Sequence, residues 1–322
     1  MNRTLGRSGI EVSAVGMGCW AIGGPAWRGD DPIGWGEVDD QESIKGIHRA
    51  IDLGVNLFDT ANVYGCGHSE RILGRALKGK RNGIVVATKF TATFDETSRK
   101  VTGADVSPAG IKKACEESLQ RLGIDSIDLY QFHSAGHDLK EAVTVRETLE
   151  ELVEEGKIRT YGWSTDDPER TRLFAEGPNC TAVQQHLNVF GGNLETLQVC
   201  EELNLASLNR GPLGMGVLTG KFNRNTTLPE DDVRRSWKFD EGQRAEELTK
   251  LEAVREILTS NGRTLAQGAL AWLWAKSEKT LPIPGFKSVS QVEENATAMQ
   301  NGPLSTEQMH EIESVVFLAA RS

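Results

Sequence analysis

Four side chains in the first half of the chain are of types that could together deliver a proton to a carbonyl oxygen. Asp59 and Tyr64 lie in "NLFDTANVYG", and Lys89 and His133 stand near the ends of the apolar runs "IVVATKF" and "IDLYQFH". A tyrosine, whose ordinary pKa is about 10, is a poor acid at neutral pH. A lysine cation within hydrogen-bond reach would stabilise the phenolate and lower that pKa, and Asp59 would hold the lysine by pairing with it. His133 would orient the carbonyl beside Tyr64.

Each of these residues also has an ordinary structural explanation. An Asp at the end of a strand commonly caps the following turn, and a nearby Tyr packs beside it. A Lys or a His at such a position is commonly solvated or hydrogen-bonded at the rim. However, five successive predicted strands carry a polar group at the same end, namely Asp59, Lys89, His133, Ser164 and Gln184. That coincidence favours a functional site.

The elements that must position these groups alternate along the chain. Short apolar runs rich in β-branched residues are followed by segments with helical periodicity, which predicts a parallel sheet covered by helices. Strands are predicted at 12–18, 56–61, 84–90, 127–133, 158–164, 181–188, 205–211 and 281–286. Eight such units without an opening GxGxxG motif favour a closed (β/α)₈ TIM barrel over an open doubly wound sheet. We expect one α/β domain, 1–322, with an N-terminal hairpin and long loops at the C-terminal face of the barrel.

The sequence contains capping signals that mark the ends of several helices. Ser107 and Pro108 begin a predicted helix that stops at Gly123, and Thr264 caps another. Further helices are predicted at about 41–53 and 139–156. The polar segment 223–243 is predicted to be an excursion after the seventh strand, of the kind that often forms a lid.

The overall composition excludes several classes of protein. A net charge of −10 over 322 residues argues against a general nucleic-acid binder. No apolar run is long enough to span a bilayer and the start has no signal-peptide core, so a cytoplasmic location is expected. The five cysteines are scattered without CxxC spacing, which predicts free thiols in a reducing compartment and no metal site.

Six motifs resemble the aldo-keto reductase family in order and spacing over essentially the whole chain. They are "FDTANVYG", "ATKF", "YQFH", "GWS", "GPLGMGVLTGKF" and "IPGFKSVSQVEEN". The forms "RGPLGMG" and "IPGFKS" are more similar to bacterial general reductases than to animal aldose reductases. The resemblance implies reduction of aldehydes and ketones to alcohols, with hydride from a nicotinamide dinucleotide and the proton from Tyr64. The implied catalytic tetrad is Asp59, Tyr64, Lys89 and His133.

The resemblance also implies where an extended cofactor would lie. From the nicotinamide end to the adenosine end, the implied contacts are Gly18, Cys19, Trp20, Ser164, Gln184, Arg210, Gly211, Leu213, Gly216, Lys221, Gly285, Lys287, Ser288, Gln291, Glu294 and Asn295. Ser164 and Gln184 would bind the carboxamide, and 210–216 with Lys221 would wrap the pyrophosphate through backbone N–H groups. A cationic Lys287 near a 2′-phosphate favours NADP over NAD.

Two positions depart from the family pattern. Thr165 follows Ser164 where an Asn is frequent, which puts one carboxamide contact in doubt. Arg210 stands where many relatives place a tyrosine that stacks on the nicotinamide ring, although a guanidinium can also lie flat on a ring.

The expected substrate is a small carbonyl compound, and Trp20, Trp27, Trp35 and Trp237 are candidates for an aromatic-walled pocket, partly shaped by the loop 25–40. A metal-dependent hydrolase using His133, His137 and His186 is a rival interpretation, but no carboxylate ligand set accompanies these histidines. A second rival is a slow cofactor-binding sensor or subunit resembling the β subunits of potassium channels. The same tetrad would be present there, and turnover rate would distinguish the two.

Overall fold

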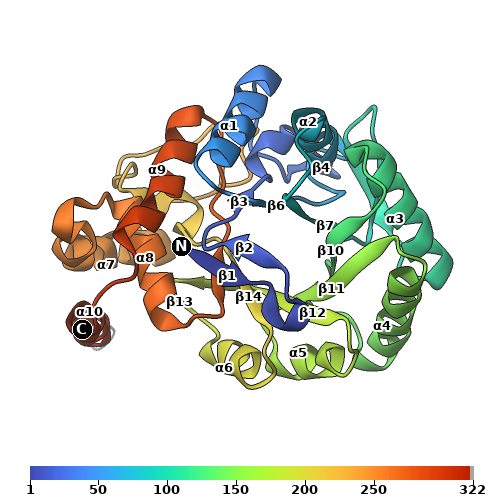
Figure 1. Cartoon of the computed structure of the whole chain (residues 1–322). Helices are drawn as coiled ribbons and strands as arrows, with labels where there is room; N and C mark the ends of the chain where they lie inside the picture. The colour runs from blue at the N-terminus through green and yellow to red at the C-terminus, as the bar shows by residue number, and fades with distance from the viewer. Residues whose placement is uncertain (320–322) are drawn as a thin grey trace.

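The eight apolar runs form eight parallel strands that close into a ring at the centre of the computed structural model (Figure 1). The strands are β3 (Met17–Gly18), β6 (Leu57–Asp59), β7 (Val85–Phe90), β10 (Ile127–Phe132), β11 (Ile158–Ser164), β12 (Cys180–Asn188), β14 (Ala206–Arg210) and β15 (Thr280–Pro282). Gly18 pairs with Gly285, just beyond β15, and thereby joins the first strand to the last. The predicted (β/α)₈ barrel is confirmed. The structure describes residues 1–319, and the end of the predicted domain, 320–322, lies outside them.

The first predicted strand, 12–18, is in fact two strands. β2 (Glu11–Ser13) pairs antiparallel with β1 (Asn2–Thr4) in the expected N-terminal hairpin, and only β3 belongs to the ring. In Figure 1 this hairpin, in dark blue, lies across the near end of the ring. Leu5 and Val12 of the hairpin pack with the apolar residues inside the barrel. The hairpin therefore closes the end of the barrel opposite to the C-terminal ends of the strands.

The turn of the hairpin is bound tightly to the barrel. The Arg7 guanidinium donates hydrogen bonds of 2.6–2.8 Å to three backbone carbonyls between residues 175 and 180. Gly6 has φ +54°, and a Cβ at that position would lie 2.1 Å from the carbonyl oxygen of Thr181. Only glycine permits this approach of the two backbones.

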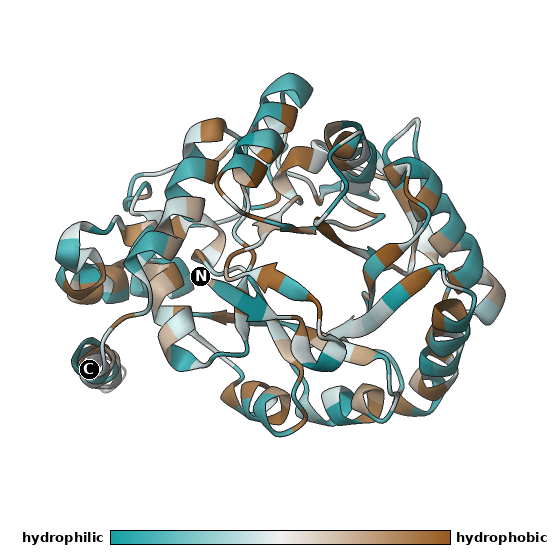
Figure 2. Ribbon diagram, viewed as in Figure 1, coloured by the Kyte–Doolittle hydropathy of each residue, from teal (hydrophilic) through white to brown (hydrophobic). Residues whose placement is uncertain are grey.

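Ten helices within the described residues surround the barrel. They are α1 (Asp40–Asp52), α2 (His68–Leu77), α3 (Pro108–Leu122), α4 (Leu139–Glu154), α5 (Pro168–Ala175), α6 (Leu194–Glu202), α7 (Gly242–Thr259), α8 (Leu265–Lys276), α9 (Val289–Asn301) and α10 (Thr306–Ala319). Their outer faces are largely hydrophilic in Figure 2, while brown apolar segments line the strands and the helix faces turned toward them. None of these helices has the length and the apolar run that crossing a membrane requires.

The predicted helix ends agree with the structure. The Ser107 hydroxyl accepts a hydrogen bond from the Gly110 amide, and Gly123 ends α3 with a left-handed φ of +65°. Thr264 caps α8 in a reciprocal capping box with Gln267.

A small second sheet that the sequence did not reveal lies beside the mouth of the barrel. It consists of β4 (Trp27–Arg28), β5 (Asp31–Pro32), β8 (Ala92–Asp95) and β9 (Lys100–Ala104), in the order β5-β4-β9-β8. A two-residue strand, β13 (Gly191–Gly192), folds back onto β12. Part of the loop 25–40 is therefore ordered as strands.

The polar excursion predicted after the seventh strand is present. After β14 the chain forms the short helix η3 (Gly214–Thr219) and then runs without regular helices to α7. This excursion reaches the first long loop, where the Val233 amide donates to the Gly34 carbonyl (2.8 Å) and Trp35 forms a bridge with Asp232.

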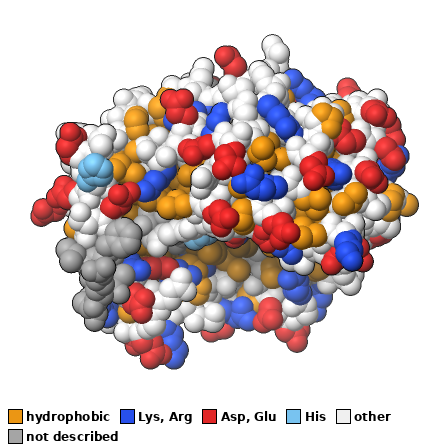
Figure 3. Space-filling view, turned by 90° about the horizontal axis from the view of Figure 1, so that it is seen from below, with side chains coloured by type: hydrophobic (Ala, Val, Ile, Leu, Met, Phe, Trp, Pro, Cys, Tyr) orange, Lys and Arg blue, Asp and Glu red, His pale blue; other side chains and the backbone are white. Residues whose placement is uncertain are grey.

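On the face of the molecule shown in Figure 3, Lys and Arg side chains are mixed with Asp and Glu side chains.

Candidate active site

The alternation of side chains along the strands carries the catalytic candidates into the barrel. In β7, Val85 and Ala87 belong to the inner apolar cluster, and Lys89 is the next residue with the same orientation. In β10, Gln131 likewise points to the same side as Leu129, two residues before it. Asp59 follows Leu57 in β6 in the same way. The apolar filling of the barrel therefore ends in a polar layer at the C-terminal ends of the strands.

Lys89 is the centre of this layer. Its side chain is fully buried, and its Nζ donates to Asp59 Oδ2 (2.6 Å), to the Thr60 carbonyl (2.8 Å) and to the Tyr64 hydroxyl (3.1 Å). An ammonium group has three donors, so all of them are used. The structure thus brings Asp59, Tyr64 and Lys89 into one hydrogen-bonded chain.

The second oxygen of Asp59 is held by two glutamines. Oδ1 accepts hydrogen bonds from Gln131 Nε2 (2.9 Å) and from Gln184 Nε2 (2.8 Å). The Gln184 amide nitrogen also donates to Gln131 Oε1 at 3.0 Å. The structure therefore gives the Gln184 amide nitrogen a different partner from the expected nicotinamide carboxamide. Sequence reasoning missed Gln131, although an uncharged polar residue inside the buried run "IDLYQFH" was a signal.

Replacing Gln131 by Met is expected to lower the free energy of unfolding by about 1–3 kcal/mol, because a buried carboxylate oxygen loses a donor while side-chain length is retained. Urea denaturation of the purified protein measures the change. Gln120→Met on the exposed face of α3 is the matched control and should have little effect. Equal stability of the two variants would show that Gln131 does not support Asp59.

His133 completes the group without a direct hydrogen bond to Tyr64. The two rings meet edge to face, with their centroids 6.3 Å apart. Burial, together with the positive charges of Lys89, Arg210 and Arg28, lowers the pKa of His133 from 6.5 to about 3. The imidazole is therefore neutral at neutral pH and can orient a carbonyl oxygen without adding a charge.

The pKa of Tyr64 differs from the sequence-based prediction. Burial raises the pKa above its ordinary value of 10, and this outweighs the opposing effect of the Lys89 cation. The expected effect of Lys89, which lowers the pKa of Tyr64, is present, but the larger effect of burial leaves the pKa raised in the free protein. Tyr64 is fully protonated at neutral pH, with Lys89 placed to stabilise the phenolate once the proton has left.

The buried neutral His133 predicts a pH dependence of stability. Because its folded pKa of about 3 lies below the unfolded value of about 6.5, the unfolded chain binds more protons between these values. The contribution of His133 is fully present above pH 6.5 and is lost progressively as the pH falls toward 3. Urea denaturation at pH 7.0, 6.0 and 5.0 should show falling stability, with a shallower fall in His133→Gln. The same slope in both proteins would contradict this.

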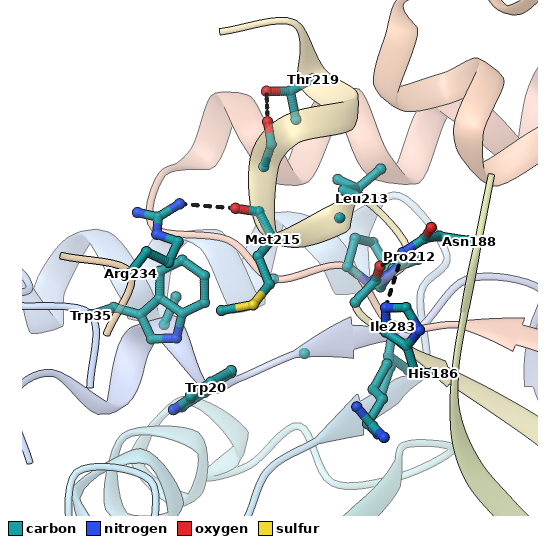
Figure 4. Close-up of a pocket in the computed structure, with 18 of the residues that line it drawn as sticks. Trp20, Trp35, His186, Asn188, Pro212, Leu213, Met215, Thr219, Arg234 and Ile283 are labelled. Carbon is teal, nitrogen blue, oxygen red and sulfur yellow. Dashed lines mark hydrogen bonds between the residues drawn. The ribbon is translucent and has the colours of Figure 1, made fainter. Parts of the chain in front are cut away.

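A cavity of about 960 Å³ opens beside this group. It runs from Tyr64 and His133 past the turn between β14 and η3 toward α9, and Figure 4 shows part of its wall. At the catalytic end, Trp20 stacks on Tyr64 with a centroid distance of 5.8 Å, and Trp35 meets Trp20 edge to face at 5.2 Å. These two tryptophans form the expected aromatic wall.

Trp27 and Trp237, the other two pocket candidates, do not line the cavity. Successive residues of a strand face opposite sides, and in β4 it is Arg28 that lines the cavity. Trp237 instead packs under the guanidinium of Arg244, 3.6 Å from the ring centroid. The orientation of these two tryptophans could not be read from their position in a loop.

The residues implied as cofactor contacts largely share this one cavity. Those that line it are Gly18, Trp20, Ser164, Gln184, Arg210, Gly211, Leu213, Gly216, Lys221, Gly285, Lys287, Gln291, Glu294 and Asn295. Cys19 and Ser288 do not line it. Cys19 is fully buried, and Ser288 is engaged as the N-cap of α9, where it accepts from the Gln291 amide.

Three cations gather along the middle and far parts of the cavity. The Lys287 ammonium donates to the carbonyls of Trp35 (2.7 Å) and Glu37 (3.2 Å), and Arg234 donates to the Met215 carbonyl (2.9 Å), as Figure 4 shows for the latter. Burial lowers the pKa of Lys221, and the neighbouring Arg234 lowers it further. Burial also lowers the pKa of Lys287. Lysines whose pKa is lowered in this way are stabilised by an anion, so this part of the cavity fits the phosphates of a dinucleotide.

The glycine-rich turn leaves room for such a ligand. Gly216 has φ +103°, and a Cβ there would lie 2.9 Å from Cε of Lys221. A side chain at residue 216 would therefore require a strained backbone angle and a shift of the Lys221 ammonium.

The two departures from the family pattern have structural explanations. Thr165 is buried, and its hydroxyl accepts a hydrogen bond from the Asp167 amide at 3.2 Å, so it stabilises a turn and does not line the cavity. Arg210 lines the cavity and forms an ion pair with Asp166, whose other oxygen accepts from the His186 amide at 2.5 Å. The ion pair with Asp166 therefore holds the Arg210 guanidinium at the end of the cavity where the nicotinamide is expected.

No group of three or more His, Cys, Asp or Glu side chains within the described part of the chain is arranged to hold a metal ion. The five cysteines are all buried free thiols.

Comparison with known proteins agrees with this geometry. The model of the aldo/keto reductase family matches residues 14–316. The chain is 32% identical over 296 residues to the aldo-keto reductase YhdN of Bacillus subtilis (strain 168), a match that covers 90% of this chain and 86% of that protein.

Solved structures give the same result. The glycerol dehydrogenase AKR11B4 from Gluconobacter oxydans is similar with a TM-score of 0.84 and 33% identity, over 97% of this chain and 94% of that one. An aldo-keto reductase from Klebsiella pneumoniae in complex with NADPH is similar with a TM-score of 0.69 and 25% identity, over 98% and 95% of the two chains. The chain belongs to the aldo/keto reductase family.

Proposed function

We propose that this protein is an NADPH-dependent reductase that converts aldehydes or ketones into alcohols. The observation that carries the proposal is the contact of the fully buried Lys89 ammonium with both Asp59 (2.6 Å) and the Tyr64 hydroxyl (3.1 Å) at the wall of a large cavity. A phenol beside a buried cation is suited to giving up a proton to a developing alkoxide.

The role of each residue follows from its position. Tyr64 donates its proton to the carbonyl oxygen, and Lys89 stabilises the resulting phenolate. Asp59 fixes the lysine, and the neutral His133 orients the carbonyl oxygen beside Tyr64. A bound reduced nicotinamide would supply the hydride that reaches the carbonyl carbon.

The choice of NADPH is supported by the cationic part of the cavity. Lys221 and Lys287 are suited to the negative charges of the cofactor, whereas the charge of Arg234 is already paired with Asp232. An additional 2′-phosphate benefits from a cation such as Lys287. The similar protein from Klebsiella pneumoniae was solved with NADPH. The backbone turn 210–216 would receive the pyrophosphate.

The test is the loss of reduced-nicotinamide absorbance with purified protein and a reactive aryl aldehyde, with NADPH and NADH measured side by side. We expect oxidation of the cofactor, with a higher kcat/KM for NADPH. Tight NADPH binding without oxidation across a panel of aldehydes and ketones would contradict the proposal and favour a cofactor-binding sensor. A preference for NADH would contradict the assignment of Lys287.

A further inference from the structure

The catalytic end of the cavity has an excess of positive charge. Two arginines, Arg28 and Arg210, line the cavity, and the charges of both lower the pKa of His133. Of the carboxylates that line the cavity, Asp59 is already bound to Lys89 and to two glutamines, and Glu246, Glu247 and Glu294 belong to α7 and α9. A negatively charged substrate would therefore be attracted to the two arginines.

The two arginines differ in how their charges are compensated. The guanidinium of Arg210 forms an ion pair with Asp166, and Asp166 is itself held by the His186 amide. Among the residues that the structure describes, none forms an ion pair or a side-chain hydrogen bond with Arg28. Arg28 is exposed at the mouth, and Asp31, which lies opposite it on β5, is paired with Arg235. The Arg28 guanidinium is therefore available to a ligand.

The position of Arg28 is set by the small sheet beside the barrel mouth. Its strand, β4, pairs with β5 on one side and with β9 on the other, and the Trp27 amide donates to the Arg99 carbonyl at 2.9 Å. Because neighbouring residues of a strand face opposite ways, this pairing directs Arg28 to the cavity while Trp27 is excluded from it. The backbone that carries the guanidinium is therefore held in place on two sides.

The cavity that Arg28 shares with the catalytic group has an apolar part of its wall. It includes Trp20, Ile33, Trp35 and Val63, and the two tryptophans are in direct contact with each other, at a centroid distance of 5.2 Å. Such a wall suits a flat apolar body, while a guanidinium binds a carboxylate through two parallel hydrogen bonds.

We propose that the preferred substrates are carbonyl compounds that carry a carboxylate on an apolar, aryl-like body, and that Arg28 is the residue that recognises this carboxylate. The inference rests on the proposed reductase function and names the substrate class of the same site. The carbonyl group lies at Tyr64 and His133, and the carboxylate lies at the mouth, where Arg28 binds it.

The test compares an acid with its neutral ester of nearly the same shape. We would measure kcat/KM of the NADPH-loaded enzyme for 4-carboxybenzaldehyde and for methyl 4-formylbenzoate, and take the ratio of acid to ester. We expect this ratio to exceed one in the wild-type protein. It should fall by about 10-fold to 100-fold in Arg28→Gln, since a charge-assisted contact is lost, and by less in Arg28→Lys. Arg172→Gln, which removes an exposed ion pair with Glu202, is the matched control and should keep the wild-type ratio.

Binding of the alcohol products supplies a readout that needs no turnover. Calorimetric titration of 4-(hydroxymethyl)benzoate and of its methyl ester into the NADP-saturated protein should show the same preference for the acid and the same loss in Arg28→Gln. An acid-to-ester ratio that Arg28→Gln leaves unchanged, in both kinetics and binding, would overturn the assignment of Arg28. A ratio below one in the wild type would overturn the substrate class. Absence of any carbonyl reduction would instead refute the proposed function, and the titration would still decide whether Arg28 binds carboxylates.

Discussion

Replacing Tyr64 by Phe is expected to slow carbonyl reduction by about 10²- to 10⁴-fold while leaving NADPH affinity nearly unchanged, because the variant keeps the ring and loses only the proton donor. The ring of Phe can still stack on Trp20, and the cationic part of the cavity around Lys221 and Lys287 is untouched. Stopped-flow measurement of hydride transfer under single-turnover conditions isolates the chemical step. Quenching of tryptophan fluorescence by NADPH reports binding separately.

Tyr130→Phe is a stringent control for this experiment. The Tyr130 hydroxyl is buried without a hydrogen-bond partner in the described structure, and its side chain stacks on Phe90 outside the catalytic layer. This variant should reduce carbonyls as the wild type does. If the Tyr64→Phe protein retained activity within a factor of a few, Tyr64 would have only a structural role, packing against Trp20.

Replacing Lys89 by Met is expected to cost both activity and stability. The Asp59 carboxylate is only 2% exposed, and without the lysine it would be left in the barrel interior with amide donors but no counter-charge. Removing one partner of a buried ion pair destabilises a protein by about 3–5 kcal/mol. Chemical denaturation should show a loss of that size, and NADPH oxidation should fall as strongly as in Tyr64→Phe.

The double variant Asp59→Asn, Lys89→Met separates the two effects. With the buried charge removed, we expect part of the stability to return, while activity stays lost because no cation remains to stabilise the Tyr64 phenolate. If the double variant were as unstable as Lys89→Met alone, the cost would come from packing around the lysine stem and not from the uncompensated carboxylate.

The sequence predicted the barrel well because hydrophobic periodicity and helix caps are local signals. Ser107, Gly123 and Thr264 mark helix ends through hydrogen bonds and backbone angles within a few residues of each cap. The eight strands were readable because a strand buried on both faces is apolar throughout. The run 12–18 was misjudged for the same reason, since apolar residues of the hairpin and of the first ring strand follow one another without a break.

The candidate site was predicted less completely. The direction of a side chain, and its distance from residues far away in the sequence, depend on how the whole chain folds. That Trp27 lies outside the cavity and Arg28 lines it depends on the pairing of β4 with β9, about 70 residues further along the chain. The role of Gln131 depends on Asp59 lying across the barrel interior, at 2.9 Å. The raised pKa of Tyr64 reflects the balance between full burial and one cation, and burial cannot be measured from residue types.

The N-terminal hairpin has a consequence for how the chain folds as it is synthesised. Residues 1–10 are synthesised long before the residues they contact, since Arg7 binds carbonyls between residues 175 and 180, and Gly6 lies against the backbone at residues 181 and 204–206. The ring itself closes only when Gly18 meets Gly285. Residues 6 and 7 therefore lack these neighbours until residue 206 has been synthesised, and Gly18 lacks Gly285 until a further 267 residues have followed it. Contacts between residues so far apart slow folding, and they leave apolar strand edges exposed until the ring closes. We therefore expect the newly made chain to be prone to aggregation until then.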